Sequence, residues 1–228
     1  MKKIMALCAL AASTLYACNN EKTAADSVNA DSTTGTTDTS MANRPDPCAG
    51  YVPDSTAAPM DSTMMSVWMA YATPGAMHQM LAKDNGEWEG EVTQWMDPNA
   101  KPQTSKSVAT NEMIMGGRYQ KSTHSGCFGG MPFEGMSLVG YDNAKKVFMS
   151  TWIDNMGTSF MNMEGKLDSA SRTIRFNGEC TNPMDGSTQR VREDFTYVDE
   201  NTQKMTMWGP DMTGKEYKMM EIVFKRKK

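Results

Sequence analysis

The chain has 228 residues, with 23 Lys and Arg against 27 Asp and Glu, which gives a formal net charge of −4 at pH 7. This acidic balance excludes the broad basic surface that nucleic-acid binding needs, so we expect no nucleic-acid partner. The only dense cationic run, residues 225–228, stands at the end of the chain, where such a run typically keeps a terminal strand soluble.

The first residues resemble the export signal of a bacterial lipoprotein. Lys2 and Lys3 form a basic start, and the apolar run Ile4–Ala12 is too short to span a bilayer. The ending Leu15–Cys18 is similar to a lipobox, which implies cleavage before Cys18 and attachment of acyl chains such as palmitate to it. We therefore predict a signal peptide over 1–17. In the alternative, an ordinary signal peptide, Cys18 is incidental.

This resemblance also predicts the location of the protein. Loss of the signal leaves 21 basic residues and a net charge of about −6. Asn19 follows Cys18, so the aspartate that retains lipoproteins in the inner membrane is missing. We expect a lipid-anchored protein of the cell envelope, held to the outer membrane and facing the periplasm or the surface.

Residues 18–58 have the composition of a disordered tether. Asn, Asp, Ser, Thr and Ala predominate, so few apolar side chains are present to repay the entropy of ordering. A flexible coil of about forty residues reaches roughly 35 Å. The dense Ser and Thr residues also fit an O-glycosylated stalk, and the sequence leaves both interpretations open.

Three cysteines remain after Cys8 leaves with the signal and Cys18 takes lipid: Cys48, Cys127 and Cys180. An odd number permits at most one bridge, and Cys127 with Cys180 is one candidate pair. No Cys-x-x-Cys motif and no Cys/His cluster at zinc spacing is present, so we predict no metal and no cofactor.

Two short helices are expected before the main domain. Apolar residues recur at three- and four-residue spacing in 59–72, which indicates an amphipathic helix. Thr73 and Pro74 supply an N-cap and a first-turn proline for a second helix that continues to about Ala82.

From Glu87 onward, runs of seven to eleven residues alternate with turn residues, which indicates short antiparallel strands. No helix-length segment remains for parallel crossovers. We therefore predict a mainly β domain over 59–228, an antiparallel up-and-down, lipocalin-like β-barrel of about ten strands. The predicted turns are 97–99, 116–117, 129–130, 142–143, 155–157, 168–169, 182–186, 199–201 and 212–214.

Alternation within the runs predicts which side chains face inward. In the first run, Trp88, Gly90, Val92 and Met96 share the inner face, whereas the glutamates between them face solvent. Three Met-x-Met pairs are expected to point both thioethers into the interior: Met113 with Met115, Met161 with Met163, and Met205 with Met207.

Residues 78–225 contain a series of short sequence blocks: His78-x-x-Leu81, Gly86-Glu87-Trp88, 115–118, 132–135, 140–142, 152–154 and 218–222. In these blocks and their order the chain resembles the DUF1579 family, a family of unknown function related in fold to the calycins. Gly86-x-Trp88 is also similar to the calycin signature, in which the tryptophan closes one barrel end beneath a basic residue, here Arg226 or Lys225. The family implies no catalytic residue, so Arg118, Glu134, Tyr141 and Asp154 are motif positions without a role.

A binding module is the leading functional hypothesis, because the mouth of a small barrel commonly holds a ligand. The ligand would be an apolar or amphiphilic small molecule, contacted by Trp88, Tyr119, Phe133, Trp152 and Phe160.

Two other function classes remain open. The 24 methionines suit copper handling, with haem binding through His78 or His124 as a variant. A packed interior would instead leave a structural or interaction lipoprotein. We assign no enzymatic activity, because the two histidines lie in no nucleophile motif and Gly-x-Ser-x-Gly is absent.

Overall fold

The computed structural model describes residues 48–52, 56 and 61–228. The predicted signal peptide, Cys18 and most of the predicted tether lie outside the described residues. The chain divides into two units at Met65 and Ser66, and the strands all belong to the unit that contains Ser66–Lys228. Among the described residues, no helix has the length and apolarity needed to cross a membrane.

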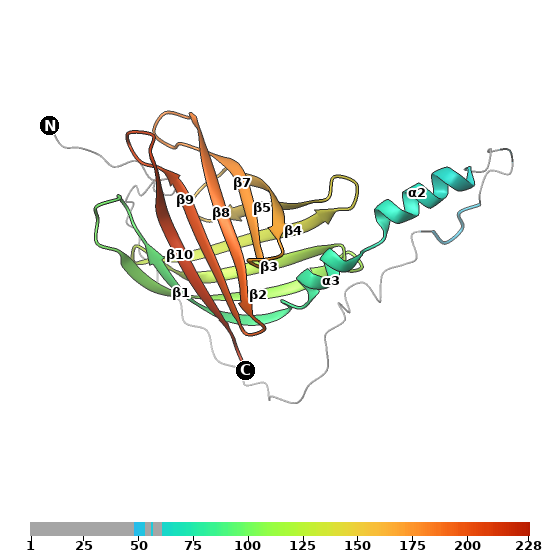
Figure 1. Ribbon diagram of the computed structural model, residues 1–228, viewed down its shortest axis with the longest axis horizontal. Helices are drawn as coiled ribbons and strands as arrows, with labels where there is room; N and C mark the ends of the chain where they lie inside the picture. The colour runs from blue at the N-terminus through green and yellow to red at the C-terminus, as the bar shows by residue number, and fades with distance from the viewer. Residues whose placement is uncertain (1–47, 53–55, 57–60) are drawn as a thin grey trace, which may run out of the picture. The chain divides into compact units, whose positions relative to one another are not determined.

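Ten antiparallel strands close into one barrel, as the turn pattern predicts (Figure 1). Each strand pairs with its neighbours in sequence, and β1 pairs with β10 to complete the ring. The strands are β1 (Gly86–Gln94), β2 (Gln103–Ile114), β3 (Tyr119–Phe128), β4 (Met131–Asp142), β5 (Val147–Asp154), β6 (Met161–Asp168), β7 (Thr173–Thr181), β8 (Thr188–Asp199), β9 (Thr202–Pro210) and β10 (Glu216–Arg226).

The inner face of the first strand is confirmed. Trp88, Gly90 and Val92 are buried, and Glu89 and Glu91 between them are exposed. The methionine pairs are confirmed in β6 and β9, where all four side chains line the interior. The prediction is wrong for Met115, which is 64 % exposed: β2 ends at Ile114, and Met115 begins a turn with φ of +51°.

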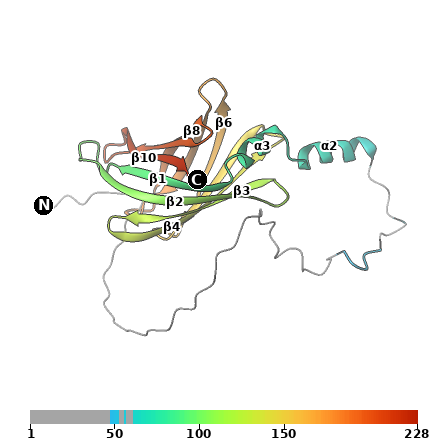
Figure 2. The ribbon, with the colours of Figure 1, turned by 90° about the horizontal axis from the view of Figure 1, so that it is seen from below.

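The helix α3 (Ala76–Ala82) covers one end of the barrel (Figure 2). It contacts β2, β3 and β4, and it buries His78 and Leu81. Leu81 packs into a core cluster with Phe148 and Ile174, and the side-chain amide of Gln120 on β3 donates to the Leu81 carbonyl at 2.8 Å. The predicted end of this helix at Ala82 is confirmed, but the predicted cap is wrong: Gly75 rather than Thr73 is the N-cap, and the helix begins at Ala76, after Pro74.

The helix α2 (Ser62–Ala72) forms where the periodicity predicts it, but its expected buried face does not exist among the described residues. Its large apolar side chains are exposed, and those of Met64, Trp68 and Met69 are more than half exposed. Apolar residues stand on every side of this helix, so their spacing predicts helix without predicting a covering surface. The side chain of Asn143 holds the end of α2 by donating to the carbonyls of Tyr71 and Thr73.

Arg226 closes the barrel over Trp88. The guanidinium carbon of Arg226 lies 4.2 Å from the centre of the Trp88 ring, and the indole Nε1 donates to the carbonyl of Asp84 at 2.9 Å. Arg226 also donates to the carbonyls of Lys83, Asn85 and Glu200. One side chain therefore ties β10 to the α3–β1 and β8–β9 connections. Of the two basic residues that the calycin resemblance offers for the contact with Trp88, Arg226 rather than Lys225 makes it.

We predict that Arg226→Met lowers the free energy of unfolding by about 1–3 kcal/mol, because it removes the cation–π contact and three charge-assisted hydrogen bonds. Urea denaturation followed by tryptophan fluorescence measures the change. Lys227→Met is the matched control, because Lys227 pairs with Glu87 where both side chains are half exposed. An equal loss in both variants would contradict the role given to Arg226.

Candidate functional site

A cavity of about 320 Å³ occupies the barrel interior, and all ten strands contribute to its wall. This volume lies at the lower end of the range of about 300–1,000 Å³ found for small-molecule sites. Leu81 of α3 lines the cavity at the covered end, whereas Phe128, Met156 and Ser159 line it near the opposite end. The cavity therefore extends along the barrel from its plug towards the loops at the other end.

Most of the wall is apolar, and thioethers form a large part of it. The lining includes eight methionines, namely Met96, Met156, Met161, Met163, Met205, Met207, Met219 and Met220. Such side chains are flexible and polarisable, so they can fit apolar ligands of different shapes.

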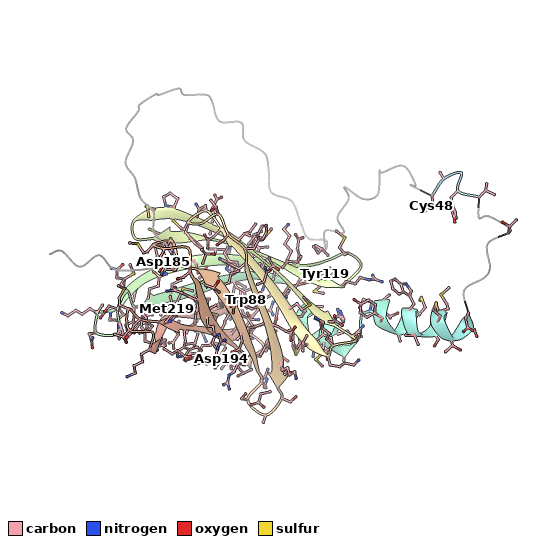
Figure 3. The ribbon with its side chains drawn as sticks, turned by 90° about the horizontal axis from the view of Figure 1, so that it is seen from above. Cys48, Trp88, Tyr119, Asp185, Asp194 and Met219 are labelled. Atoms are coloured by element: carbon pink, nitrogen blue, oxygen red, sulfur yellow. The ribbon has the colours of Figure 1, made fainter. Side chains whose placement is uncertain are left out.

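Three of the five aromatic residues predicted to contact a ligand line the cavity: Trp88, Phe133 and Trp152. The other two lie elsewhere. Tyr119 is 43 % exposed and faces outward (Figure 3), since Gln120 takes the inward position of β3. Phe160 is 66 % exposed in the loop before β6. Alternation in β3 reveals the orientation of Tyr119. That the three inward residues bind a ligand stays a prediction.

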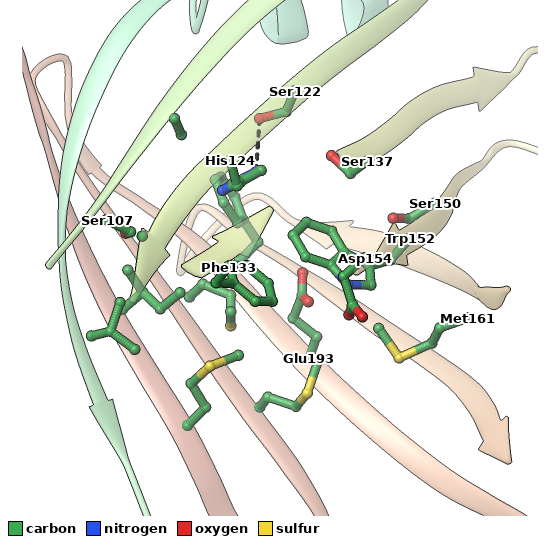
Figure 4. Close-up of a pocket in the computed structure, with 18 of the residues that line it drawn as sticks. Ser107, Ser122, His124, Phe133, Ser137, Ser150, Trp152, Asp154, Met161 and Glu193 are labelled. Carbon is green, nitrogen blue, oxygen red and sulfur yellow. Dashed lines mark hydrogen bonds between the residues drawn. The ribbon is translucent and has the colours of Figure 1, made fainter. Parts of the chain in front are cut away.

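An aromatic cluster forms one side of the cavity (Figure 4). Phe133 and Trp152 are stacked with ring centres 6.3 Å apart, and the ring of His124 meets Trp152 edge-on at 5.1 Å. The indole Nε1 of Trp152 donates to Oδ2 of Asp154 at 2.7 Å. A side chain at Gly135 would overlap the Trp152 ring, so the glycine at this position of β4 makes room for the cluster.

A chain of hydrogen bonds fixes the proton of His124. The side-chain NH₂ of Asn111 donates to the Asp84 carbonyl, so the amide oxygen of Asn111 faces Ser122 and accepts its hydroxyl proton. The Ser122 oxygen must then accept from Nε2–H of His124, at 2.8 Å. Burial lowers the pKa of His124 to about 4, so the ring is neutral at physiological pH and Nδ1 carries a lone pair.

Glu193 brings a carboxyl group into the cavity from β8. Burial, together with the neighbouring charge of Asp194, raises the pKa of Glu193 to about 7. No hydrogen bond or ion pair from a described residue reaches this carboxyl group. The sequence analysis missed Glu193, although alternation with Val191, Phe195 and Tyr197 places it on the apolar inner face.

A second buried carboxyl group, that of Asp84, lies beneath the plugged end. Burial raises the pKa of Asp84 to about 7, although hydrogen bonds from Tyr197, Gln203 and Gln120 and the charge of Arg226 oppose this shift. Burial and the proximity of Asp84 raise the pKa of the Tyr197 hydroxyl well above its usual value. Within the closed end of the barrel, the Tyr197 hydroxyl therefore keeps its proton and donates it in a hydrogen bond to the carboxyl group of Asp84.

We predict that wild-type stability falls between pH 4 and 7, because Asp84 keeps its proton in the folded state after the unfolded chain has lost it. Asp84→Asn should reduce the difference in unfolding free energy between pH 5 and pH 8 by roughly 1–3 kcal/mol. Denaturant titrations at the two pH values measure it. Glu200→Gln, at an exposed position, should leave the difference unchanged. An undiminished pH dependence in Asp84→Asn would refute the assignment.

The remaining motif residues organise turns and packing. Oδ1 of Asp154 accepts from the backbone N–H groups of Met156 and Gly157, and Nη1 of Arg118 donates to the Met115 carbonyl. The ring of Tyr141 packs edge-on against Phe148 at 4.9 Å. At Glu134 the backbone holds Asn155: its N–H donates to the Asn155 side chain, and its carbonyl accepts from the Asn155 N–H.

In the part of the chain that the structure describes, no group of three or more His, Cys, Asp or Glu residues is placed to hold a metal ion. His78 is occupied: Nδ1 accepts from the Gly75 N–H at 3.0 Å, and the ring donates to the Tyr141 carbonyl. Cys127 on β3 carries a free thiol, so it forms no bridge with Cys180 on β7.

The comparisons with known proteins agree with this fold. The family model described as "Protein of unknown function (DUF1579)" matches residues 73–226. A solved structure titled "Crystal Structure of Rv2717c from M. tuberculosis" is similar with a TM-score of 0.51 and 10% sequence identity, over 68% of this chain and 100% of that chain. No curated protein sequence matches the chain.

Proposed function

The chain belongs to the DUF1579 family, whose function is unknown, and we propose that its barrel binds a small apolar or amphiphilic molecule in the interior cavity. We further propose that lipid on Cys18 holds this binding domain to the outer membrane. The first proposal stands on the cavity, and the second stands on the sequence of the export signal.

The main support for the binding proposal is that small side chains occupy many of the strand positions that face the barrel interior. Five of the six serines that line the cavity stand on strands, where leucine or valine would fill a packed core: Ser105, Ser107, Ser122, Ser137 and Ser150. Cavity volume costs roughly 24 cal/mol per Å³ in an apolar core, so a volume of about 320 Å³ forgoes several kcal/mol of packing. A protein with only a structural role gains nothing from this loss, whereas a binding protein requires it.

We predict that the neutral apolar fluorophore N-phenyl-1-naphthylamine binds the wild-type chain and that Ser137→Phe weakens its binding at least ~10-fold, because the new ring fills the cavity. Leu138→Phe is the matched control: Leu138 is the next residue of β4 and is 39 % exposed on the outer face. Fluorescence titration measures both affinities. Equal binding by the two variants, or none by the wild type, would contradict the proposal.

The anchoring proposal has a separate test. Cells fed an alkyne analogue of palmitate should label the wild-type protein, and Cys18→Ala should abolish the label because no other residue follows the lipobox pattern. Cys48→Ala changes an exposed cysteine of the mature chain and should keep the label. Labelling that survives Cys18→Ala would show that Cys18 is incidental to the signal.

A further inference from the structure

The cavity contains an acidic side chain, Glu193, that no positively charged side chain of the lining neutralises. Only three charged residues belong to its lining: Lys106, Asp154 and Glu193. Lys106 is exposed and stands between the inward-facing Ser105 and Ser107, so its ammonium group points away from the cavity. No described side chain therefore supplies a positive charge inside the cavity.

The two acids differ in how their oxygens are used. Asp154 accepts hydrogen bonds from the Trp152 indole and from two backbone N–H groups, so its carboxylate is largely satisfied. Glu193 accepts none from the described residues. Its direct neighbours across the sheet are Phe176 on β7 and Met207 on β9, and neither can donate. Its carboxyl group requires a donor from outside the protein.

The basic residue nearest in sequence is committed to the outer face. Arg192 pairs with Asp194 at 3.1 Å and with Glu216 at 2.8 Å, and its guanidinium lies over the Trp208 ring. Turning Arg192 towards Glu193 would break all three contacts and reverse the alternation of β8. The protein thus keeps its cations outside while it keeps Glu193 inside.

His124 presents a second unused acceptor to the cavity, in addition to the buried hydroxyl of Ser107, which has no hydrogen-bond partner among the described residues and can donate or accept. The hydrogen-bond chain through Asn111 and Ser122 places the imidazole proton on Nε2, so Nδ1 of His124 offers a lone pair, and no described residue donates to it. A ligand group that carries protons satisfies both Glu193 and His124 better than one that carries only lone pairs. The stacked rings of Phe133 and Trp152 add faces that favour a cation.

Resting on the proposed function, we propose that the cavity selects small organic cations: a protonated amine pairs with the Glu193 carboxylate, and its apolar body lies against the methionines and the Phe133–Trp152 pair. The Glu193 carboxylate disfavours ligands that are themselves carboxylates, such as fatty acids, because it would repel a second anion and no cation of the cavity would compensate.

The test compares three ligands with the same chain: octylamine, 1-octanol and octanoate. Isothermal titration calorimetry at pH 8 uses residues 18–228 with Cys18→Ser, so that no detergent competes. At this pH Glu193 is ionised, because burial raises its pKa only to about 7. We expect octylamine to bind roughly 10- to 100-fold more tightly than 1-octanol, and octanoate more weakly than either.

Two variants separate the charge from the cavity. Glu193→Gln should bring octylamine to the affinity of 1-octanol and leave 1-octanol unchanged. Glu179→Gln makes the same change at an exposed position of β7 and should keep the preference for the amine.

The outcomes distinguish the two proposals. Equal affinities in the wild type, or a preference for octanoate, would overturn the cation proposal while binding of 1-octanol still supported a ligand-binding barrel. Failure of all three ligands to bind would overturn both. Should Glu193→Gln fail to fold, the order of the three affinities in the wild type decides the matter.

Discussion

The pairing of β1 with β10 closes the barrel, and every inward-facing side chain owes its burial to this closure. Seven residue pairs, from Trp88 with Arg226 to Gln94 with Met220, join the first strand to the last and leave the sheet without an edge. Without this ladder the inward side chains would face solvent and would enclose nothing. Arg226 strengthens the ladder at its end, since it covers Trp88 and binds carbonyls on both sides of the seam.

Closure creates an interior that is divided between packing and binding. Near α3, bulky residues such as Leu81, Phe148 and Ile174 fill the barrel and are almost fully buried. Further along, serines and thioethers replace them, and the cavity opens between the walls (Figure 4). The packed end supplies the stability that lets the other end remain hollow. The two acids follow the same division: Tyr197, Gln203 and Gln120 donate to Asp84 in the plug, whereas no described residue donates to Glu193 in the cavity.

The sequence predicts the barrel well because each strand carries its own signal. Turn residues mark all nine connections, and alternation in β1 identifies the inner face. The Trp88–Arg226 contact could also be anticipated, since it follows from the calycin resemblance. Met115 was misplaced because the Met-x-Met pattern continues past Ile114, whereas the following glycines turn the chain.

The candidate site was harder to predict, because it depends on which inward positions remain unfilled. Tyr119 and Phe160 were chosen for being aromatic, although neither faces the cavity. The sequence analysis does not single out Glu193, because an acidic residue in an alternating strand is usually expected to face solvent. Only its two-residue spacing from Val191 and Phe195 shows that it lies on the same, inward face as they do. The absence of a partner for Glu193 appears only when β7 and β9 are placed beside it.

If the barrel interior holds a small molecule in the cell, the protein purified from its own host with no ligand added should still carry that molecule. Native mass spectrometry detects it. We expect one equivalent of a small basic molecule bound to the wild-type chain and lost from Ser137→Phe. A spectrum that shows only the mass of the chain in both proteins would mean that the barrel is empty and would rule out the binding role.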